Sequence, residues 1–206
     1  MKKFLAVFLS AAMLLSILAL AGCGSTTEET TPEDTQETST TAEFTTVTEG
    51  KLTMSTNAQF PPYEMVADDG SFEGIDIEVA QAIADKLGLE LQVDDMDFDG
   101  ALLAAQNGKS DMVMAGVTIT DERKAVMDFS DTYGVQVVIV KEDSDITTID
   151  DLEGKMIGTQ QGTTGYLYCS DTPENGGYGE ENVTAYADGA TAVQALINGQ
   201  VDCVVI

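Results

Sequence analysis

Histidine and tryptophan are both missing from this 206-residue chain. Without histidine the sequence excludes Ser-His-Asp and Cys-His catalysis, and it lacks the commonest protein ligand for metals. Only three cysteines are present, and none of them forms a CxxC pair. A structural zinc site with four Cys or His ligands is therefore excluded, and we expect neither a metal nor another cofactor.

Basic residues are scarce as well. The chain has 9 Lys+Arg against 36 Asp+Glu, which gives a formal net charge of −27. Such a chain repels phosphate backbones, so we expect no nucleic acid among its partners. With 43% hydrophobic residues it can still bury a core.

The N-terminus has the pattern of an export signal. Two lysines at positions 2 and 3 precede residues 4–20, which carry no charge, and residues 20–23 read LAGC. The alternative is an uncleaved transmembrane helix, because about 17 apolar residues reach the lower limit for spanning a bilayer. The LAGC ending resembles the lipobox of bacterial lipoproteins, which favours the interpretation of residues 1–22 as a signal peptide. The resemblance implies that the chain is cut before Cys23 and that the Cys23 thiol carries the lipid.

Residues 24–49 have the composition of a flexible tether. They contain eleven threonines and seven acidic residues, and no basic residue. Too little apolar area is present there to offset the conformational entropy of ordering the chain. We therefore expect the lipidated Cys23 to be followed by a disordered, solvated segment up to residue 49, and the protein to be held by its lipid at the extracytoplasmic face of the cell membrane.

The pattern of residues 50–140 is that of alternating strands and helices. Apolar spacing of i, i+3, i+4, i+7 predicts a helix over residues 76–87, with Asp76 as its N-cap and Gly88 as a left-handed C-cap. Asp99 is expected to cap a second, short helix. Together the elements follow a β-loop-α-β-α-β order, which is typical of an α/β sheet with crossover helices. The expected elements are strands 51–55, 89–93 and 111–115, helices 76–87 and 99–106, and an unbroken apolar strand over 135–140 that is buried on both faces.

A charged break at residues 141–145 precedes a second α/β unit. Strand 155–160, a loop at 161–165 that opens onto a helix, helix 190–198 and strand 201–206 are expected there. Two units that meet near residue 141 predict two lobes, with residues 50–140 as the N-terminal part of the first and 141–206 as the second. Since the chain stops inside an apolar strand, we expect the sequence to be truncated and the second lobe to be incomplete.

Four stretches in order carry a resemblance to a known family. They are residues 56–64 (TNAQFPPYE), 74–78 (GIDIE), 115–131 (AGVTITDERK, continuing to DFSD) and 161–164 (QGTT). In these stretches the chain resembles solute-binding protein family 3, the amino-acid-binding subunits of ABC importers. The resemblance implies an α/β, two-lobe periplasmic-binding-protein-like fold of type II, incomplete here at the C-terminus, with the ligand cleft between the lobes. It also implies an Asp directly after strand 201–206 that would pair with the ligand's ammonium group.

Arg123 is the first candidate for the ligand site. A planar guanidinium holds a carboxylate through two parallel hydrogen bonds, which Lys cannot do; the alternative is a surface ion pair with nearby acids. Thr118 follows a strand end, where α/β sheets bind ligands, and Thr164 stands at a helix start, where it would bind an anion or serve as a simple N-cap. The remaining site residues are implied by the resemblance: Gly116 as a carbonyl acceptor, Phe60 and Phe98 as aromatic walls or else as core, Asn57 and Gln160 at the side-chain end, and Ala115, Gln161 and Thr163 beside them.

The expected function is the binding of a free amino acid and its delivery to an ABC transporter permease by a monomeric, non-enzymatic protein. Asn57 and Gln160 offer amides without charge, which favours a polar, uncharged ligand. Two alternatives remain: a dehydratase built on the same fold, and the ectodomain of a sensor.

Two weaker patterns occur in the sequence. Residues 95–100 copy the first half of a calcium loop, but its twelfth position is Gln106 in place of Glu, so a structural role without metal is favoured. Cys169 and Cys203 are either free buried thiols or a disulfide, and sequence alone does not show the Cα separation that a disulfide needs.

Overall fold

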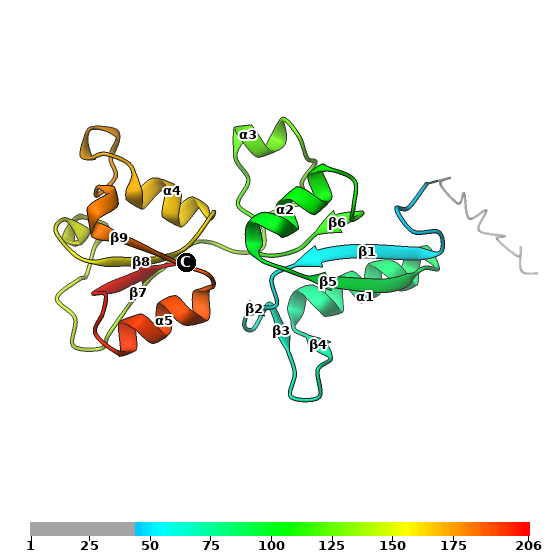
Figure 1. The fold of residues 1–206 in the computed structure, drawn as a ribbon, viewed down its shortest axis with the longest axis horizontal. Helices are drawn as coiled ribbons and strands as arrows, with labels where there is room; N and C mark the ends of the chain where they lie inside the picture. Colours follow the sequence, from blue (N-terminus) through cyan, green and yellow to red (C-terminus); the bar gives the residue numbers. More distant parts are fainter. Residues whose placement is uncertain (1–43) are drawn as a thin grey trace, which may run out of the picture. The chain divides into compact units, whose positions relative to one another are not determined.

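The computed structural model describes residues 44–206, and these residues form three sheets. Figure 1 shows one parallel sheet with two crossover helices, a small antiparallel sheet beside it, and a mixed sheet further along the chain. No helix of the described part is both long enough and apolar enough to cross a membrane. The predicted signal peptide, Cys23 and most of the predicted tether lie outside the described residues.

The parallel sheet has the strand order β5-β1-β6, with β1 (Lys51–Thr56) in the middle. β1 pairs along its whole length with β5 (Glu90–Asp95), and its end pairs with β6 (Met112–Val113). Its buried polar side chains are all hydrogen-bonded: Ser55, for example, donates to the carbonyl of Ala101 at 2.9 Å. The sheet thus confirms the order of elements predicted from the first part of the sequence.

Helix α1 (Ile75–Leu87) begins one residue earlier than predicted, and its N-cap is Gly74. The prediction that Asp76 caps the helix is wrong, because Asp76 lies inside the first turn and is fully buried. Gly74 has a φ of 123°, and a Cβ there would collide with the carbonyl of Tyr63. The C-terminal prediction is confirmed, since Gly88 adopts the left-handed conformation with a φ of 72°.

Helix α2 (Phe98–Gln106) is capped by Asp97, whose side chain accepts from the N–H of Gly100 at 2.9 Å. The prediction that Asp99 is the cap is therefore wrong by two residues. The first turn of α2 brings Phe98 into a small core with Leu102 and Ala115.

The antiparallel sheet was not predicted, because its strands are very short. It consists of β2 (Gln59–Phe60), β3 (Glu64–Val66) and β4 (Phe72–Glu73), in that order. The cis peptide bond between Pro61 and Pro62 lies in the turn between the first two strands. This turn directs the Glu64 side chain inward, where it is only 1% exposed.

The mixed sheet has the order β7-β10-β8-β9. β10 (Cys203–Val205) is antiparallel to β7 (Val138–Val140) and parallel to β8 (Ile157–Gln160), which is in turn parallel to β9 (Val183–Tyr186). The prediction of a fully buried strand over 135–140 is wrong, because Val135 is 85% exposed and β7 begins only at Val138. β7 is an edge strand of this sheet, and its three residues are only partly buried.

Two helices cover the mixed sheet on opposite sides of β10 (Figure 1). On the side of α4 (Thr164–Ser170) the buried cluster contains Leu152, Ile157, Cys169 and Cys203. On the side of α5 (Gly189–Ile197) it contains Ala192, Ala195, Leu196, Val201 and Val204. Cys169 and Cys203 are both free, so the disulfide alternative is not realised here.

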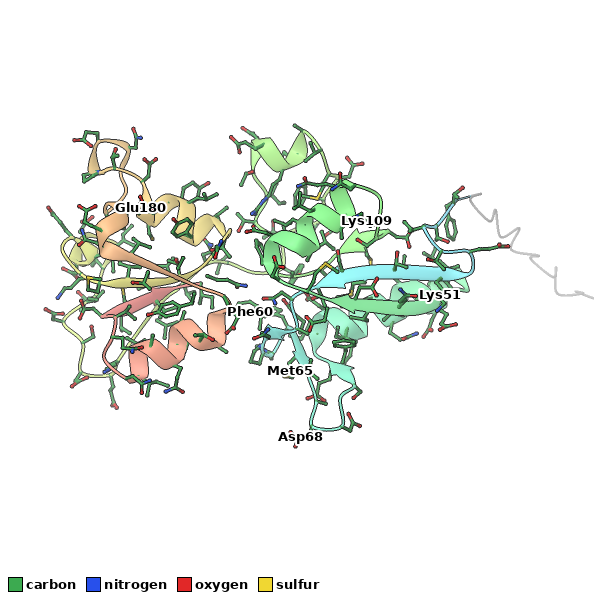
Figure 2. All side chains as sticks on the ribbon, in the orientation of Figure 1. Lys51, Phe60, Met65, Asp68, Lys109 and Glu180 are labelled. Atoms are coloured by element: carbon green, nitrogen blue, oxygen red, sulfur yellow. The ribbon has the colours of Figure 1, made fainter. Side chains whose placement is uncertain are left out.

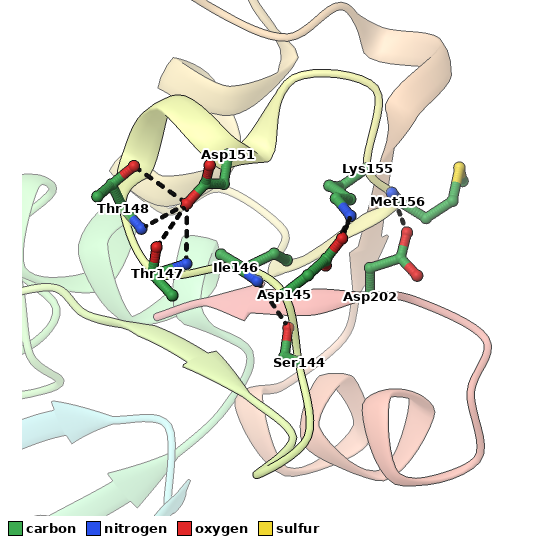
Figure 3. Close-up of polar contacts among 9 residues, drawn as sticks. All are labelled: Ser144, Asp145, Ile146, Thr147, Thr148, Asp151, Lys155, Met156 and Asp202. Atoms are coloured by element: carbon green, nitrogen blue, oxygen red, sulfur yellow. Dashed lines mark hydrogen bonds and ion pairs between the residues drawn. The ribbon is translucent and has the colours of Figure 1, made fainter.

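Carboxylates hold the loops at the far end of this sheet, as Figure 3 shows. Asp151 completes a capping box at the short 3-10 helix Ile149–Leu152 and accepts from the N–H groups of Thr147 and Thr148, both at 2.9 Å. These hydrogen bonds lower the pKa of Asp151. Lys155 pairs with Asp145 at 2.8 Å. The remaining short helices are α3 (Asp121–Lys124) and the 3-10 turns Pro173–Asn175 and Glu180–Asn182.

Candidate functional site

A cavity of about 940 Å³ lies at the carboxyl ends of β1 and β8. Asn57 directly follows β1 and Gln160 is the last residue of β8, so the cavity is placed where α/β sheets bind ligands. Helix starts at Phe98 and Thr164, the loop after β6 and the segment that precedes β7 supply the other walls. No group of His, Cys, Asp or Glu that could hold a metal ion occurs among residues 44–206.

The structure brings ten of the eleven predicted ligand residues to the lining of this cavity. The exception is Gln161, whose side chain is exposed and whose N–H donates to the carbonyl of Tyr186 at 2.9 Å. The ten that line the cavity are Asn57, Phe60, Phe98, Ala115, Gly116, Thr118, Arg123, Gln160, Thr163 and Thr164.

Arg123 is held in place by backbone carbonyls of both units. Its Nη1 donates to the carbonyl of Thr118 at 2.9 Å, and its Nη2 donates to the carbonyl of Gly162 at 3.3 Å. The guanidinium carbon lies 5.7 Å from the centroid of the Phe98 ring, within range of a cation–π contact. Burial lowers the pKa of Arg123 and the nearby Asp99 raises it, but a guanidinium stays charged in proteins. Of its five N–H donors only two are used by these carbonyls, which leaves donors for an anion.

Threonines of both units meet beside Arg123. The hydroxyl of Thr164 donates to that of Thr118 at 2.9 Å and accepts from the amide of Gln136, also at 2.9 Å. Thr163, not Thr164, is the N-cap of α4, and its hydroxyl accepts from the N–H of Tyr166. Polar groups from three separate segments therefore converge at one wall of the cavity.

The amides of Asn57 and Gln160 bind each other. Gln160 Nε2 donates to Asn57 Oδ1 at 2.8 Å, and Asn57 Nδ2 donates to the carbonyl of Met96 at 2.9 Å. Both side chains are buried. The prediction of a polar, uncharged ligand depends on the hydrogen-bonding groups of these amides that the protein itself does not use.

A row of aromatic rings forms another wall. The rings of Phe60 and Tyr63 are stacked with centroids 5.6 Å apart, and those of Tyr63 and Tyr133 are 6.1 Å apart. Phe60, labelled in Figure 2, lies against two glycines, because a Cβ at Gly116 or Gly189 would be within 3.6 Å of its ring. Sequence reasoning missed Tyr63 and Tyr133, although Tyr63 stands three residues from Phe60 in a stretch already singled out.

Two buried acids are a second omission. Glu64 lines the cavity, and Asp76 behind it accepts from the hydroxyl of Tyr133 at 3.1 Å. Their side chains are 1% and 0% exposed. The sequence gives no local signal for their burial, because Asp and Glu are almost never fully buried, and Asp76 was expected to be a helix cap.

Comparison with known proteins agrees with this architecture. The family model for bacterial extracellular solute-binding proteins, family 3, matches residues 52–202. The chain belongs to this family. Solved structures of binding proteins are similar to this chain. The arginine-bound form of truncated ArgBP from T. maritima is 38% identical, with a TM-score of 0.67 over 76% of this chain and 73% of that one. The α/β, two-lobe fold expected from the sequence is thereby confirmed. An ancestral arginine-binding protein bound to glutamine is 40% identical, with a TM-score of 0.67 over 77% of this chain and 70% of that one.

Curated relatives of this family member are named for different amino acids. The arginine-binding extracellular protein ArtP of Bacillus subtilis is 41% identical over 115 residues, which are 55% of this chain and 45% of ArtP. The L-cystine-binding protein TcyJ of Escherichia coli is 32% identical over 161 residues, which are 76% of this chain and 59% of TcyJ. The chain thus spans about half of the length of these two relatives. Their names are those of binding proteins, and they give no support to the dehydratase alternative.

Proposed function

We propose that this protein binds a free amino acid outside the cytoplasm and delivers it to the permease of an ABC importer. The observation that carries the proposal is the cavity beside Arg123, where a cation with free N–H donors stands next to aromatic walls. The relatives described above are named as arginine-binding and L-cystine-binding proteins, which supports an amino acid as the class of ligand.

Each polar wall has a role in this proposal. Arg123 holds the ligand's carboxylate through the fork that two parallel N–H groups provide. Thr118 and Thr164 add hydroxyl groups on the same side, and the carbonyl of Gly116 accepts from the ammonium. Phe60 and Phe98 enclose the ligand's aliphatic carbons and exclude water, which strengthens the charged hydrogen bonds.

A role is also proposed for each segment of the chain. Residues 1–22 act as the signal peptide, Cys23 carries the lipid, residues 23–49 form the tether, and residues 50–140 and 141–206 belong to the two lobes. The family's description as extracellular supports a place outside the cytoplasm. Replacing Cys23 with Ala should release the protein from the membrane or leave its precursor unprocessed, and membrane partitioning equal to that of the wild type would remove the anchor from the proposal.

Thermal-shift screening of the twenty amino acids tests the binding function. A ligand at about 100 times its Kd stabilises by about 2.7 kcal/mol, which corresponds to a rise in Tm of about 5–10 °C for a domain of this size. The decarboxylated amine of the best ligand is the control, and it should give no shift, because Arg123 would have no carboxylate to hold. The absence of a shift with any amino acid would refute the proposed function.

A further inference from the structure

The buried acids Glu64 and Asp76 form a pair that the fold itself leaves incompletely bonded. Glu64 Oε2 and Asp76 Oδ1 are buried and have no hydrogen-bond partner among residues 44–206. Within the same residues, no lysine or arginine forms an ion pair with either carboxyl group. Two acids from different elements, β3 and α1, are therefore packed together without a cation.

Two such carboxyl groups cannot both be charged, because isolated buried charges cost several kcal/mol each. Burial, then the charge of Asp76 and its hydrogen bond, raise the pKa of Glu64 to about 9. Burial also raises the pKa of Asp76, against hydrogen bonds from Tyr133 and Glu64. The other titratable groups that face the pair are Tyr133 and, beyond it, Tyr63; burial and the two acids raise the pKa of Tyr133, so it stays neutral. At neutral pH the pair therefore holds one proton and one negative charge.

One member of the pair, Glu64, borders the cavity on the side of the aromatic row. Glu64 lines the cavity together with Phe60, Tyr63 and Tyr133, and Arg123 lines it as well. A negative group among aromatic faces is a favourable environment for a cation. The amides of Asn57 and Gln160 are hydrogen-bonded to each other, and that of Asn57 also donates to the carbonyl of Met96, so part of their hydrogen-bonding capacity is used within the protein.

We propose that the ligand is an amino acid with a cationic side chain, and that Glu64, positioned by Asp76 and Tyr133, receives this cation and gives up the shared proton to solvent. The proposal rests on the amino-acid-binding function proposed above and names the chemical class of the ligand. In the exchange one O–H bond of the carboxyl group breaks, the proton passes to buffer, and the ligand's cation takes its place beside the two carboxylates. The proton keeps the site stable when empty, and the cation replaces it when filled.

Calorimetry on the full-length protein with arginine, lysine and glutamine tests this assignment. Glu64→Gln keeps the shape of the side chain but has no acidic proton that binding could release. Glu78→Gln is the matched control, because Glu78 is exposed and lies on the same helix as Asp76. We expect arginine or lysine to bind the wild type at least about tenfold more tightly than glutamine, and Glu64→Gln to lose about tenfold or more for the cation alone. Glu78→Gln should bind all three amino acids as the wild type does.

The proton gives a second readout. Binding enthalpies measured at about pH 7 in phosphate and in Tris should differ by the equivalent of close to one released proton for the wild type, and by none for Glu64→Gln. The affinity for the cation should also rise with pH toward the pKa of Glu64, because deprotonation then costs less. Tighter binding of glutamine, equal loss of affinity for all ligands in Glu64→Gln, or no proton release would each overturn the inference. Binding of an uncharged amino acid alone would leave the proposed function standing, whereas binding of no amino acid would refute that function first.

Discussion

Replacing Arg123 is the sharpest test of how the cavity holds an amino acid. The side chain is half-buried, donates to the carbonyls of Thr118 and Gly162 at 2.9 and 3.3 Å, and lies 5.7 Å from the Phe98 ring centroid. These contacts position its remaining N–H donors toward the cavity. Arg123→Ala removes the charge, and Arg123→Lys keeps the charge but replaces the fork by a point charge.

The expected loss of affinity can be worked from these contacts. Truncating one partner of a buried, hydrogen-bonded charge pair costs about 2–5 kcal/mol, which is a factor of about 30 to several thousand in Kd. In Arg123→Lys one ammonium cannot reach both carbonyls and a ligand carboxylate, so we expect a loss of at least about tenfold. Folding stability should fall by only about 1–3 kcal/mol, because each lost hydrogen bond is partly replaced by water at the cavity wall.

Calorimetry with the best ligand from the thermal-shift screen measures both variants. Lys124→Ala is the matched control, since it removes the adjacent cation, whose ion pair with Asp121 at 3.4 Å is solvent-exposed and worth at most about 1 kcal/mol. If Arg123→Ala binds within about twofold of the wild type, the carboxylate is held elsewhere and the reasoning from geometry is refuted.

Three further predictions concern folding. Asp111→Ala should lower the free energy of unfolding by about 2 kcal/mol at neutral pH, because the Asp111 side chain accepts hydrogen bonds from the N–H and the hydroxyl of Thr53 at 2.7 and 2.6 Å. Burial raises the pKa of Asp111, yet these hydrogen bonds outweigh it and hold the pKa below its usual value. The stabilisation is therefore present above the ordinary carboxyl pKa and is lost as the pH falls through the lowered pKa of the folded state. The urea midpoints of the wild type and of Asp111→Ala should converge in acid. Gly74→Ala should lower Tm markedly, because a Cβ would collide with the carbonyl of Tyr63 and because the φ of 123° at Gly74 is unfavourable for any other residue. A Tm within about one degree of the wild type would contradict this. Ile157→Ala removes a fully buried side chain and should cost about 2–5 kcal/mol in urea unfolding, and a loss below about 1 kcal/mol would show that the core closes around the gap.

Local patterns in the sequence were sufficient for most elements of the fold. The apolar spacing of residues 76–87 predicted a helix, and Gly88 predicted its end, because both depend on neighbours within one or two helical turns. The same approach placed Asp76 and Asp99 at helix starts, where the structure has Gly74 and Asp97. A cap is decided by which residue turns away from the helix, and packing against Tyr63 makes that choice for α1.

Chemistry that depends on distant residues required the folded chain. Composition alone excluded histidine-based catalysis and argued against nucleic acid as a partner, and the family resemblance of four stretches implied most of the ten residues that line one cavity. Tertiary structure determined which of their groups already have partners: it pairs Gln160 with Asn57 across 103 positions of sequence, and so uses part of the amide groups that a polar ligand would need. It also buries Glu64 beside Asp76. The pKa of a carboxyl group depends on the charges and the dielectric around it, and those are supplied by residues that only the fold brings together.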